Sequence, residues 1–306
     1  MAQIAYQFLS KFKTKNLLYQ QFIIELVGTF ILIVLIDNAV ATYTFGHPSD
    51  HFAIATTAGV GLYIAVVFGA TVSAGHVNPV VTFALATLRK CPWKSVPVYF
   101  AGQFIGGFAA TVVSFANQRL AIVARSGLNG TFPSKTASLF MSNPGIRPVD
   151  HETVILDQVL CVGILMFAIM VLIDGSNNHN SKSATPFGLL FVLIAVILAF
   201  GSNAGAAINP ARDLPARLFG FMIGLGDMWS DMFWLTASTI GTFLGAVVGA
   251  WTYYLTVEIH RINDNADLRN GSANDLNLTE LRTTLDKLEA LVDAEKGLKS
   301  HTKLLD

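Results

Sequence analysis

Asn-Pro occurs twice in the chain, at Asn78-Pro79 and Asn209-Pro210, and each pair follows a long apolar segment. Proline suits the first turn of a helix and asparagine suits its N-cap, so each pair predicts the start of a helix. A helix N-terminus carries a partial positive charge, and each asparagine adds an amide NH2 that donates hydrogen bonds. Two such starts inside a membrane would bind a passing water or hydroxyl oxygen from both sides. The pattern therefore predicts a duplicated membrane pore.

Arg212 follows the second Asn-Pro pair after one intervening residue. A charge at membrane depth is costly and normally functional. At a pore mouth it would repel cations and donate hydrogen bonds to solute hydroxyls. The alternative is a purely structural clamp. At the centre, Asn78 and Asn209 would hold a water oxygen with its hydrogens pointing away in both directions, which interrupts a proton-conducting chain of water.

Composition indicates a membrane protein, since 53% of the 306 residues are hydrophobic and only 13% are charged. Lys and Arg number 20, as do Asp and Glu, so no basic surface suggests a nucleic-acid partner. Cys91 and Cys161 are the only cysteines, which argues against a structural disulfide and against a zinc site. No nucleophile, metal cluster or carboxylate pair converges in the pattern. An enzyme is therefore not expected, and neither is a cofactor.

Six apolar segments are long enough to cross a hydrocarbon core about 30 Å thick. They lie near residues 17–43, 52–72, 96–121, 153–173, 184–202 and 232–257. Segments 78–88 and 209–219 are too short to span and are predicted to enter and return as half-helices. The order span, span, half-helix, span occurs twice, and its odd number of crossings inverts the second half relative to the first. The expected fold is an all-α membrane protein with six transmembrane helices and two re-entrant half-helices in an inverted repeat.

The expected fold divides the chain into an N-terminal segment, a channel domain and a C-terminal tail. Their expected bounds are 1–16, 17–258 and 259–306, with repeat one at 17–123, repeat two at 153–258 and an outer linking loop at 124–152. Lys and Arg of the short loops gather on the side of the termini, which predicts that both termini are cytoplasmic.

Two features outside the spans carry separate expectations. Asn129 begins an Asn-Gly-Thr sequence in the outer linking loop and is a candidate for glycosylation. Leucines recur at steps of three and four near 276–296, which predicts an amphipathic helix in the tail. This helix either lies on the cytoplasmic surface of the channel or forms a coiled-coil contact between protomers.

The two Asn-Pro pairs, with the six-span pattern around them, resemble the aquaporin (major intrinsic protein) family. Residues 25–29 (Glu-Leu-Val-Gly-Thr) and 75–82 (Gly-His-Val-Asn-Pro-Val-Val-Thr) are similar to two further signatures of that family. The resemblance covers roughly 20–258. Residues 209–213 (Asn-Pro-Ala-Arg-Asp), followed by Arg217, look like the glycerol-conducting branch.

The resemblance implies a passive channel in the plasma membrane that acts without a cofactor and forms a homotetramer with one pore per subunit. Such a channel passes water, glycerol and urea-sized neutral solutes, and it excludes ions and protons.

The family pattern also implies which residues form the pore. The central constriction maps to Asn78, Pro79, Val80, Asn209, Pro210 and Ala211, and the selectivity filter maps to Ala58, Ile197, Ala206 and Arg212. Glycerol channels usually carry two aromatic residues and a glycine at the three filter positions besides the arginine. The filter here is therefore predicted to be wide and apolar, with Arg212 as its only strong polar group. A neighbouring aromatic residue, Tyr63 or Phe200, is the alternative wall.

Supporting roles are expected for five further residues. Asp213 and Arg217 should form an i,i+4 ion pair that holds Arg212 and the loop in place. Glu25 and Gln158 should hydrogen-bond backbone groups of the two re-entrant loops, because polar groups inside spans need partners. His76 is either a satisfied loop residue or a pH-sensitive gate.

Two smaller observations stay open. Ser238-Thr239 stands where the glycerol-conducting branch often has Pro-Leu, and Asp37 in the first span has no evident partner.

Three other functions remain open at this stage. The chain could be a water-selective or unorthodox aquaporin with little glycerol flux, or a structural junctional membrane protein whose pore is incidental. A coupled secondary transporter also uses inverted repeats and broken helices. It would need ion-coordinating acids at mid-membrane, and only Glu25 and Asp37 offer themselves. Swelling of vesicles that contain the purified protein separates these classes, since a channel needs no ion gradient.

Overall fold

The computed structural model describes residues 10, 13–45, 50–126, 136, 138–143, 149–177, 183–225 and 228–261. These residues form helices and connecting segments, and no strand occurs among them. The chain divides into two compact units, 1–253 and 254–306. The described part of the second unit contains the short π-helix η3 (Tyr254–Glu258). All the other elements belong to the first unit.

Six helical stretches are long and apolar enough to cross a membrane, as the sequence predicts. They are α2 (Leu17–Phe45), α3 (His51–Gly69), Trp93–Ala124, α7 (His151–Ile173), α8 (Thr185–Ala204) and Phe233–Arg261. The third consists of η1 (Trp93–Ser95) and α5 (Val96–Ser126); the sixth begins with α10 (Phe233–Leu235), η2 (Thr236–Gly241) and α11 (Thr242–Tyr253). Large apolar side chains on the outer faces are exposed, for example Val60, Ile64 and Val67 of α3. Lipid covers such surfaces, so the chain is a multi-pass membrane protein.

Two short helices begin at the Asn-Pro pairs, α4 (Pro79–Thr87) and α9 (Pro210–Met222). Asn78 caps α4, since its Oδ1 accepts a hydrogen bond of 3.2 Å from the Val80 amide. Asn209 caps α9 in the same way, with a hydrogen bond of 2.9 Å from the Ala211 amide. At a rise of about 1.5 Å per residue, neither helix can span the hydrocarbon core. The two predicted half-helices are therefore confirmed, and α9 runs a few residues further than expected.

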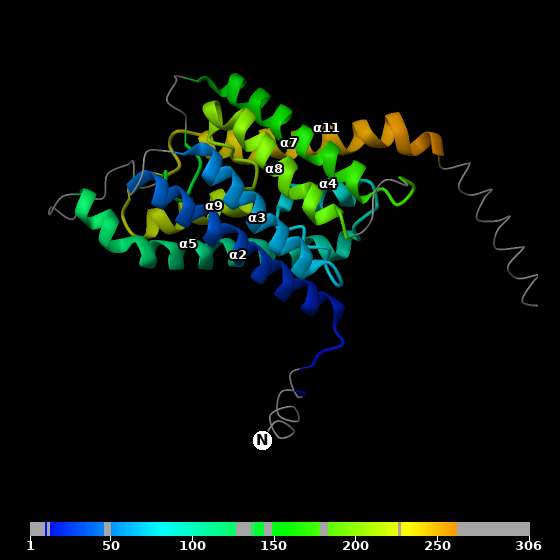
Figure 1. The fold of residues 1–306 in the computed structure, drawn as a ribbon, viewed down its shortest axis with the longest axis horizontal. Helices are drawn as coiled ribbons and strands as arrows, with labels where there is room; N and C mark the ends of the chain where they lie inside the picture. Colours follow the sequence, from blue (N-terminus) through cyan, green and yellow to red (C-terminus); the bar gives the residue numbers. More distant parts are fainter. Residues whose placement is uncertain are drawn as a thin grey trace, which may run out of the picture. The chain divides into compact units, whose positions relative to one another are not determined.

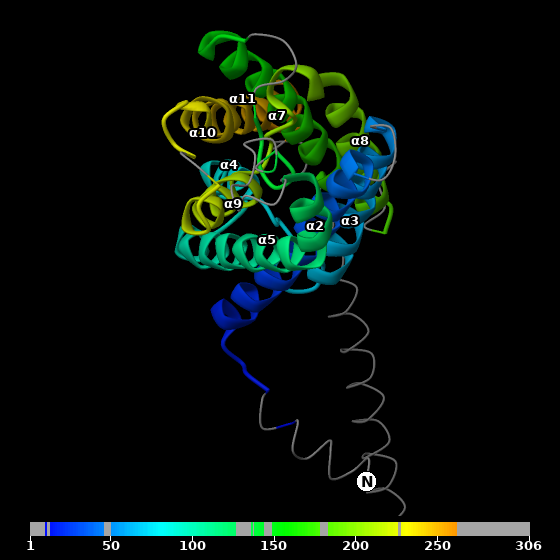
Figure 2. The same cartoon turned by 90° about the vertical axis from the view of Figure 1, so that its left-hand side faces the viewer.

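The helices of the two halves pair in the same manner. In the first half α2 packs against α3 and α5, and in the second half α7 packs against α8 and α11. The halves are joined by a contact of α3 with α8 and by an exchange of half-helices, since α4 packs on α11 and α9 packs on α5. Figures 1 and 2 show α4 and α9 enclosed between the α2–α5 layer and the α7–α11 layer. This arrangement is the inverted repeat that the sequence predicts.

The start of α9 lies directly against α5. Gly107 of α5 allows this approach, because a Cβ at that position would overlap the Ala211 carbonyl oxygen. Further along, the Phe219 ring packs edge-on against Phe108 and Phe115, with ring centroids 6.0 and 5.4 Å apart. These contacts fix the N-terminus of α9, and with it Asn209 and Arg212, relative to the first half.

Candidate pore

A cavity of about 490 Å³ lies between the two halves. Side chains of α2, α3, α7 and α8 make up about half of its lining, and most of the other lining residues come from the two re-entrant segments. Its described lining is dominated by Leu, Ile, Val and Ala, and it contains no Phe, Tyr or Trp. Polar groups reach it mainly from Asn78, Asn209 and Arg212 near the half-helix starts, and from His76, Lys90 and Asp174 elsewhere. A solute inside would meet apolar walls with a few fixed donors.

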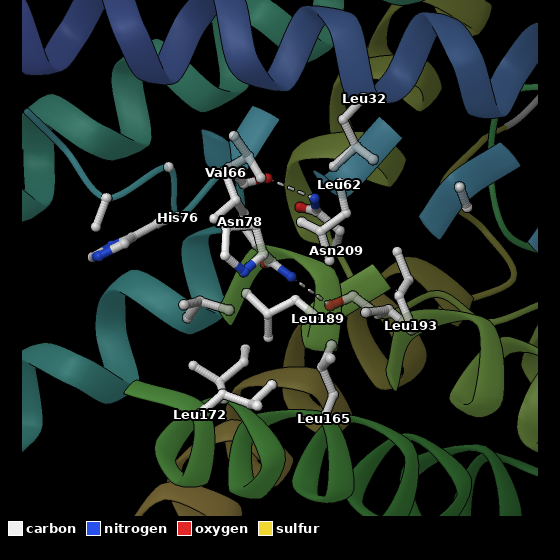
Figure 3. A pocket seen from close by; sticks show the side chains of 18 of the residues that line it. Leu32, Leu62, Val66, His76, Asn78, Leu165, Leu172, Leu189, Leu193 and Asn209 are labelled. Atoms are coloured by element: carbon white, nitrogen blue, oxygen red, sulfur yellow. Dashed lines mark hydrogen bonds between the residues drawn. The ribbon is translucent and has the colours of Figure 1, made fainter. Parts of the chain in front are cut away.

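Asn78 and Asn209 face one another across this cavity (Figure 3). The Asn78 Nδ2 donates to the Ile208 carbonyl oxygen at 3.2 Å, and the Asn209 Nδ2 donates to the Val77 carbonyl oxygen at 2.8 Å. Each amide is thus oriented by the loop of the other half. An amide nitrogen carries two hydrogens, so one of them is left for a solute oxygen. Both amides sit at the positive ends of α4 and α9.

Glu25 anchors the first re-entrant loop from within α2. Its carboxylate accepts hydrogen bonds from the amides of His76 and Val77 at 2.9 and 2.7 Å. It also accepts bonds from Ser73 Oγ at 2.6 Å and from Gln103 Nε2 at 2.7 Å. These bonds satisfy a buried charge that would otherwise be very costly. They fix the path of the loop just before Asn78.

Gln158 holds the second loop from within α7, where its Oε1 accepts a hydrogen bond of 2.9 Å from the Ile208 amide. Its Nε2 donates to Asp157 at 2.9 Å, and Asp157 in turn accepts a bond of 3.0 Å from Asn203. The expectation that Glu25 and Gln158 bind loop backbone groups is therefore confirmed. The two anchors occupy corresponding helices but differ in charge.

Arg212 lies at the cavity wall and is held by Ser142 of the linking loop. Its NH1 donates to Ser142 Oγ at 2.9 Å. Asp213 and Arg217 form the expected ion pair, with the Arg217 Nε 2.9 Å from Asp213 Oδ2. Both residues also bind the backbone of Ser142. Arg217 NH2 donates to the Ser142 carbonyl oxygen at 2.7 Å, and the Ser142 amide donates to Asp213 Oδ1. One serine thus joins all three charged residues, and the ion pair positions the loop that holds Arg212.

Comparison with known proteins agrees with this geometry. Residues 11–253 match the family model described as Major intrinsic protein. The chain belongs to the major intrinsic protein family. Aquaporin-10 of Homo sapiens is 31% identical over 81% of this chain and 84% of its own length. Aquaglyceroporin-9 of Botryotinia fuckeliana (strain B05.10) is 34% identical over 75% of this chain and 52% of its own length.

The aquaglyceroporin of Plasmodium falciparum shares the fold of this major intrinsic protein. Its crystallographic chain superposes with a TM-score of 0.69 at 22% sequence identity. The match covers 78% of this chain and 96% of that chain. At this identity the likeness concerns the fold alone, and it agrees with the six spans and two half-helices described above.

The structure of this major intrinsic protein brings the four expected filter residues to one cavity. Ala58, Ile197, Ala206 and Arg212 all line it. The width of the filter stays a prediction. The alternative aromatic wall is not formed, because neither Tyr63 nor Phe200 belongs to the described lining. Tyr63 instead pairs edge-on with Phe187 at 6.3 Å.

Four residues expected at the central constriction do not reach the cavity. Pro79, Val80, Pro210 and Ala211 are buried in the first turns of the half-helices and are absent from the described lining. The cause is geometric: successive side chains of a helix point about 100° apart around its axis, so the residues next to each capping asparagine face the packed side. Val81 and the residues before each asparagine line the cavity instead.

His76 has partners within the first half. Its Nδ1 lies 3.1 Å from Thr82 Oγ1, and its ring packs 4.8 Å from the Tyr99 ring. These contacts favour the satisfied loop residue over the gate.

The sequence did not indicate Gln103 and Ser142, because no motif marks either position. The candidate glycosylation site Asn129 and the tail helix at 276–296 lie outside the described residues.

Proposed function

We propose that this protein is a passive transmembrane channel for water and glycerol that excludes ions and protons. The observation that carries the proposal is a single cavity with an apolar wall, two facing asparagine amides and one arginine. Glycerol has a hydrocarbon edge and three hydroxyls. The apolar wall suits the edge, and the amides of Asn78 and Asn209 together with Arg212 suit the hydroxyls.

Room for glycerol follows from the small filter residues. Ala58 and Ala206 add little bulk, Ile197 adds an apolar surface, and the described lining contains no Phe, Tyr or Trp. A water-selective channel would need a narrower and more polar constriction. This difference favours glycerol conduction over the water-selective alternative.

Exclusion of protons and cations rests on charge and orientation. The positive ends of α4 and α9 meet at the asparagine pair, so a water there must point its hydrogens away in both directions. Hydrogen-bonded water then cannot relay a proton across this point. Arg212 adds a positive charge that raises the barrier for cations.

Several finer features belong to the same proposal. We infer a homotetramer in the plasma membrane with one pore per subunit and with both termini in the cytoplasm, as the loop charges predict. Neutral solutes of about the size of urea should also pass the filter. The channel domain is proposed to span 17–258, between a cytoplasmic N-terminal segment and a cytoplasmic tail.

Stopped-flow measurement of water and glycerol permeability in vesicles tests this function. The native protein should conduct both solutes without an ion gradient. Ala206→Tyr combined with Ile197→His should reduce glycerol flux about tenfold or more while much of the water flux remains, because bulk and a second polar group enter the filter. Val60→Tyr places an aromatic ring on the exposed outer face of α3 and serves as the matched control. A native protein that passes water but excludes glycerol would contradict the proposal.

A further inference from the structure

Five basic residues gather where two neighbouring membrane-spanning helices begin. No Asp or Glu occurs in residues 13–24 or 83–101, so these segments supply no counter-charge of their own. The five residues are exposed and lie in the segments just before α2 and α5; together we call them the basic patch: Lys13, Lys15, Arg89, Lys90 and Lys94.

The starts of α2 and α5 lie level with one another. A Cβ on Gly102 of α5 would lie 2.6 Å from the Phe22 carbonyl oxygen of α2, and a Cβ on Gly106 would overlap the Leu26 carbonyl oxygen. Both contacts advance by four residues, so the two helices run in the same direction. α2 begins five residues before the first contact and α5 begins six residues before it. Figure 1 shows both starts on the same side of the first unit.

Hydrogen bonds hold both basic segments to their helices. Asn16 caps α2, because its Oδ1 accepts a hydrogen bond of 3.2 Å from the Tyr19 amide. In the other segment the Arg89 amide donates to the Ala86 carbonyl oxygen at the end of α4, at 3.0 Å. The backbone therefore keeps the basic patch beside the two helix starts.

Two exposed aromatic side chains lie at the same level. Tyr19, in the first turn of α2, is 54% exposed, and Trp93, next to Lys94, is 55% exposed. Trp and Tyr favour the boundary between the hydrocarbon core and the lipid headgroups. The Trp93 ring packs edge-on against Phe83, with ring centroids 5.9 Å apart, which fixes its place. The basic patch therefore lies at the depth of the headgroups.

Spans that begin on the opposite membrane face start with acidic residues instead. Asp50 and Asp150 cap α3 and α7, and Asp231 accepts a hydrogen bond from the Phe233 amide at the start of the sixth span. The dipole of a helix favours negative charge at its start and disfavours positive charge there. The helices themselves thus account for the acidic residues and do not account for the basic patch. An anionic group from outside the chain does account for it.

We propose that the basic patch binds the headgroups of anionic phospholipids in the leaflet on this side of the membrane. Phosphate and carboxylate oxygens of a headgroup accept hydrogen bonds from Arg89 and the lysines, and Trp93 and Tyr19 contact the upper part of the acyl chains. This leaflet is the one proposed above to face the cytoplasm, where anionic lipids are concentrated. The inference concerns the lipid around the protein and does not depend on which solute the pore conducts.

The experiment measures the ratio of the affinities for phosphatidylserine and phosphatidylcholine. The full chain is purified in a neutral detergent and titrated with each lipid at the same acyl-chain length, and native mass spectrometry counts the bound lipids. The native protein should prefer phosphatidylserine. Each basic residue near a membrane surface favours anionic lipid by about fivefold, so Arg89→Gln should lower the ratio about fivefold. Adding Lys94→Gln should lower it about tenfold or more in total.

Arg119→Gln is the matched control. Arg119 is also exposed, but it lies towards the opposite end of α5, so its loss should leave the ratio within about twofold of the native value. Lys90 is kept in every variant because it lines the cavity. If the variants at 89 and 94 do not fold, Lys13→Gln with Lys15→Gln removes two charges from the other segment and should lower the ratio to a similar extent.

Three results would overturn the inference. The first is a native ratio close to one. The second is an equal fall of the ratio in Arg119→Gln, because the preference would then follow total charge and not the basic patch. The third is displacement of phosphatidylserine by inorganic phosphate at the same concentration, which would assign the patch to a soluble anion. Loss of water and glycerol flux in native vesicles would instead contradict the channel function and leave the lipid preference standing.

Discussion

The two re-entrant loops follow the same backbone path with different sequences. Ala74, Gly75 and Val77 have φ of 66°, 64° and 44° in the first loop, and the corresponding residues Gly205, Ala206 and Ile208 have φ of 61°, 53° and 40° in the second. Each loop thus places three left-handed residues before its capping asparagine. Glycine occupies the middle of these positions in one loop and the first in the other. The shared path requires the left-handed conformation at these positions without requiring glycine at any particular one.

The polar groups that stabilise this path differ between the halves. The first loop depends on one buried carboxylate, Glu25, which binds four donors. The second loop has the neutral Gln158, which accepts one backbone bond, and its charges lie instead in α9, where Asp213 and Arg217 bind Ser142. One half concentrates its stabilisation in a single side chain, and the other distributes it. The same backbone path can therefore be stabilised by two different hydrogen-bond networks.

The largest expected effect follows from removal of the two anchors. Glu25→Ala strands two backbone amides and removes one acceptor each from Ser73 and Gln103. Gln158→Ala strands the Ile208 amide and leaves Asp157 with one donor fewer. Each stranded buried donor costs about 1–3 kcal/mol, so Glu25→Ala should destabilise the protein by several kcal/mol and Gln158→Ala by about 1–3 kcal/mol. Thermal unfolding in detergent, followed by size-exclusion chromatography, measures the difference. Equal losses of stability would show that the first half depends on a single side chain no more than the second half does.

A smaller difference is expected between the two loop glycines. A Cβ on Gly75 would lie 2.8 Å from both the Ala65 carbonyl oxygen and the Val66 Cα, which are backbone atoms that cannot easily move. A Cβ on Gly205 would meet nothing closer than 3.6 Å. Both substitutions by alanine incur roughly 1–2 kcal/mol for the left-handed conformation. Gly75→Ala should add an overlap penalty and lose more stability than Gly205→Ala in the same unfolding assay. A reversed order would remove close packing as the reason for glycine at position 75.

The sequence predicted the fold and much of the pore, because Asn-Pro and apolar span length have local physical causes. A helix start is encoded within two residues, so α4 and α9 could be located before any packing was known. The role of Glu25 followed from the cost of a charge within a span. Ser142 could not be found in this way, since its partners Asp213 and Arg217 lie more than 70 residues away in the chain.

The lining of the pore was only partly predictable. Ala58, Ile197 and Ala206 could be placed by counting from the two asparagines. Val80 and Ala211 were expected at the constriction because they adjoin these asparagines, yet they pack into the protein. Adjacency in sequence does not determine which side of a helix turn faces a cavity, because successive side chains point about 100° apart around the axis. This orientation follows only from the tertiary contacts of α4 with α11 and of α9 with α5.

The smallest expected effect tests whether stabilisation in the second half is truly distributed. Ser238 of η2 donates to Asp213 Oδ2, which also binds Arg217. After Ser238→Ala, Asp213 keeps Arg217 and the Ser142 amide, so the loss should be only about 1 kcal/mol. Thr239→Ala is the matched control, because Thr239 Oγ1 donates to the Trp234 carbonyl oxygen and does not contact Asp213. The unfolding midpoint should fall slightly further for Ser238→Ala than for Thr239→Ala, with an unchanged ratio of glycerol to water permeability. A loss as large as that of Glu25→Ala would instead make Ser238 the concentrated support of α9 and would abolish the contrast between the halves.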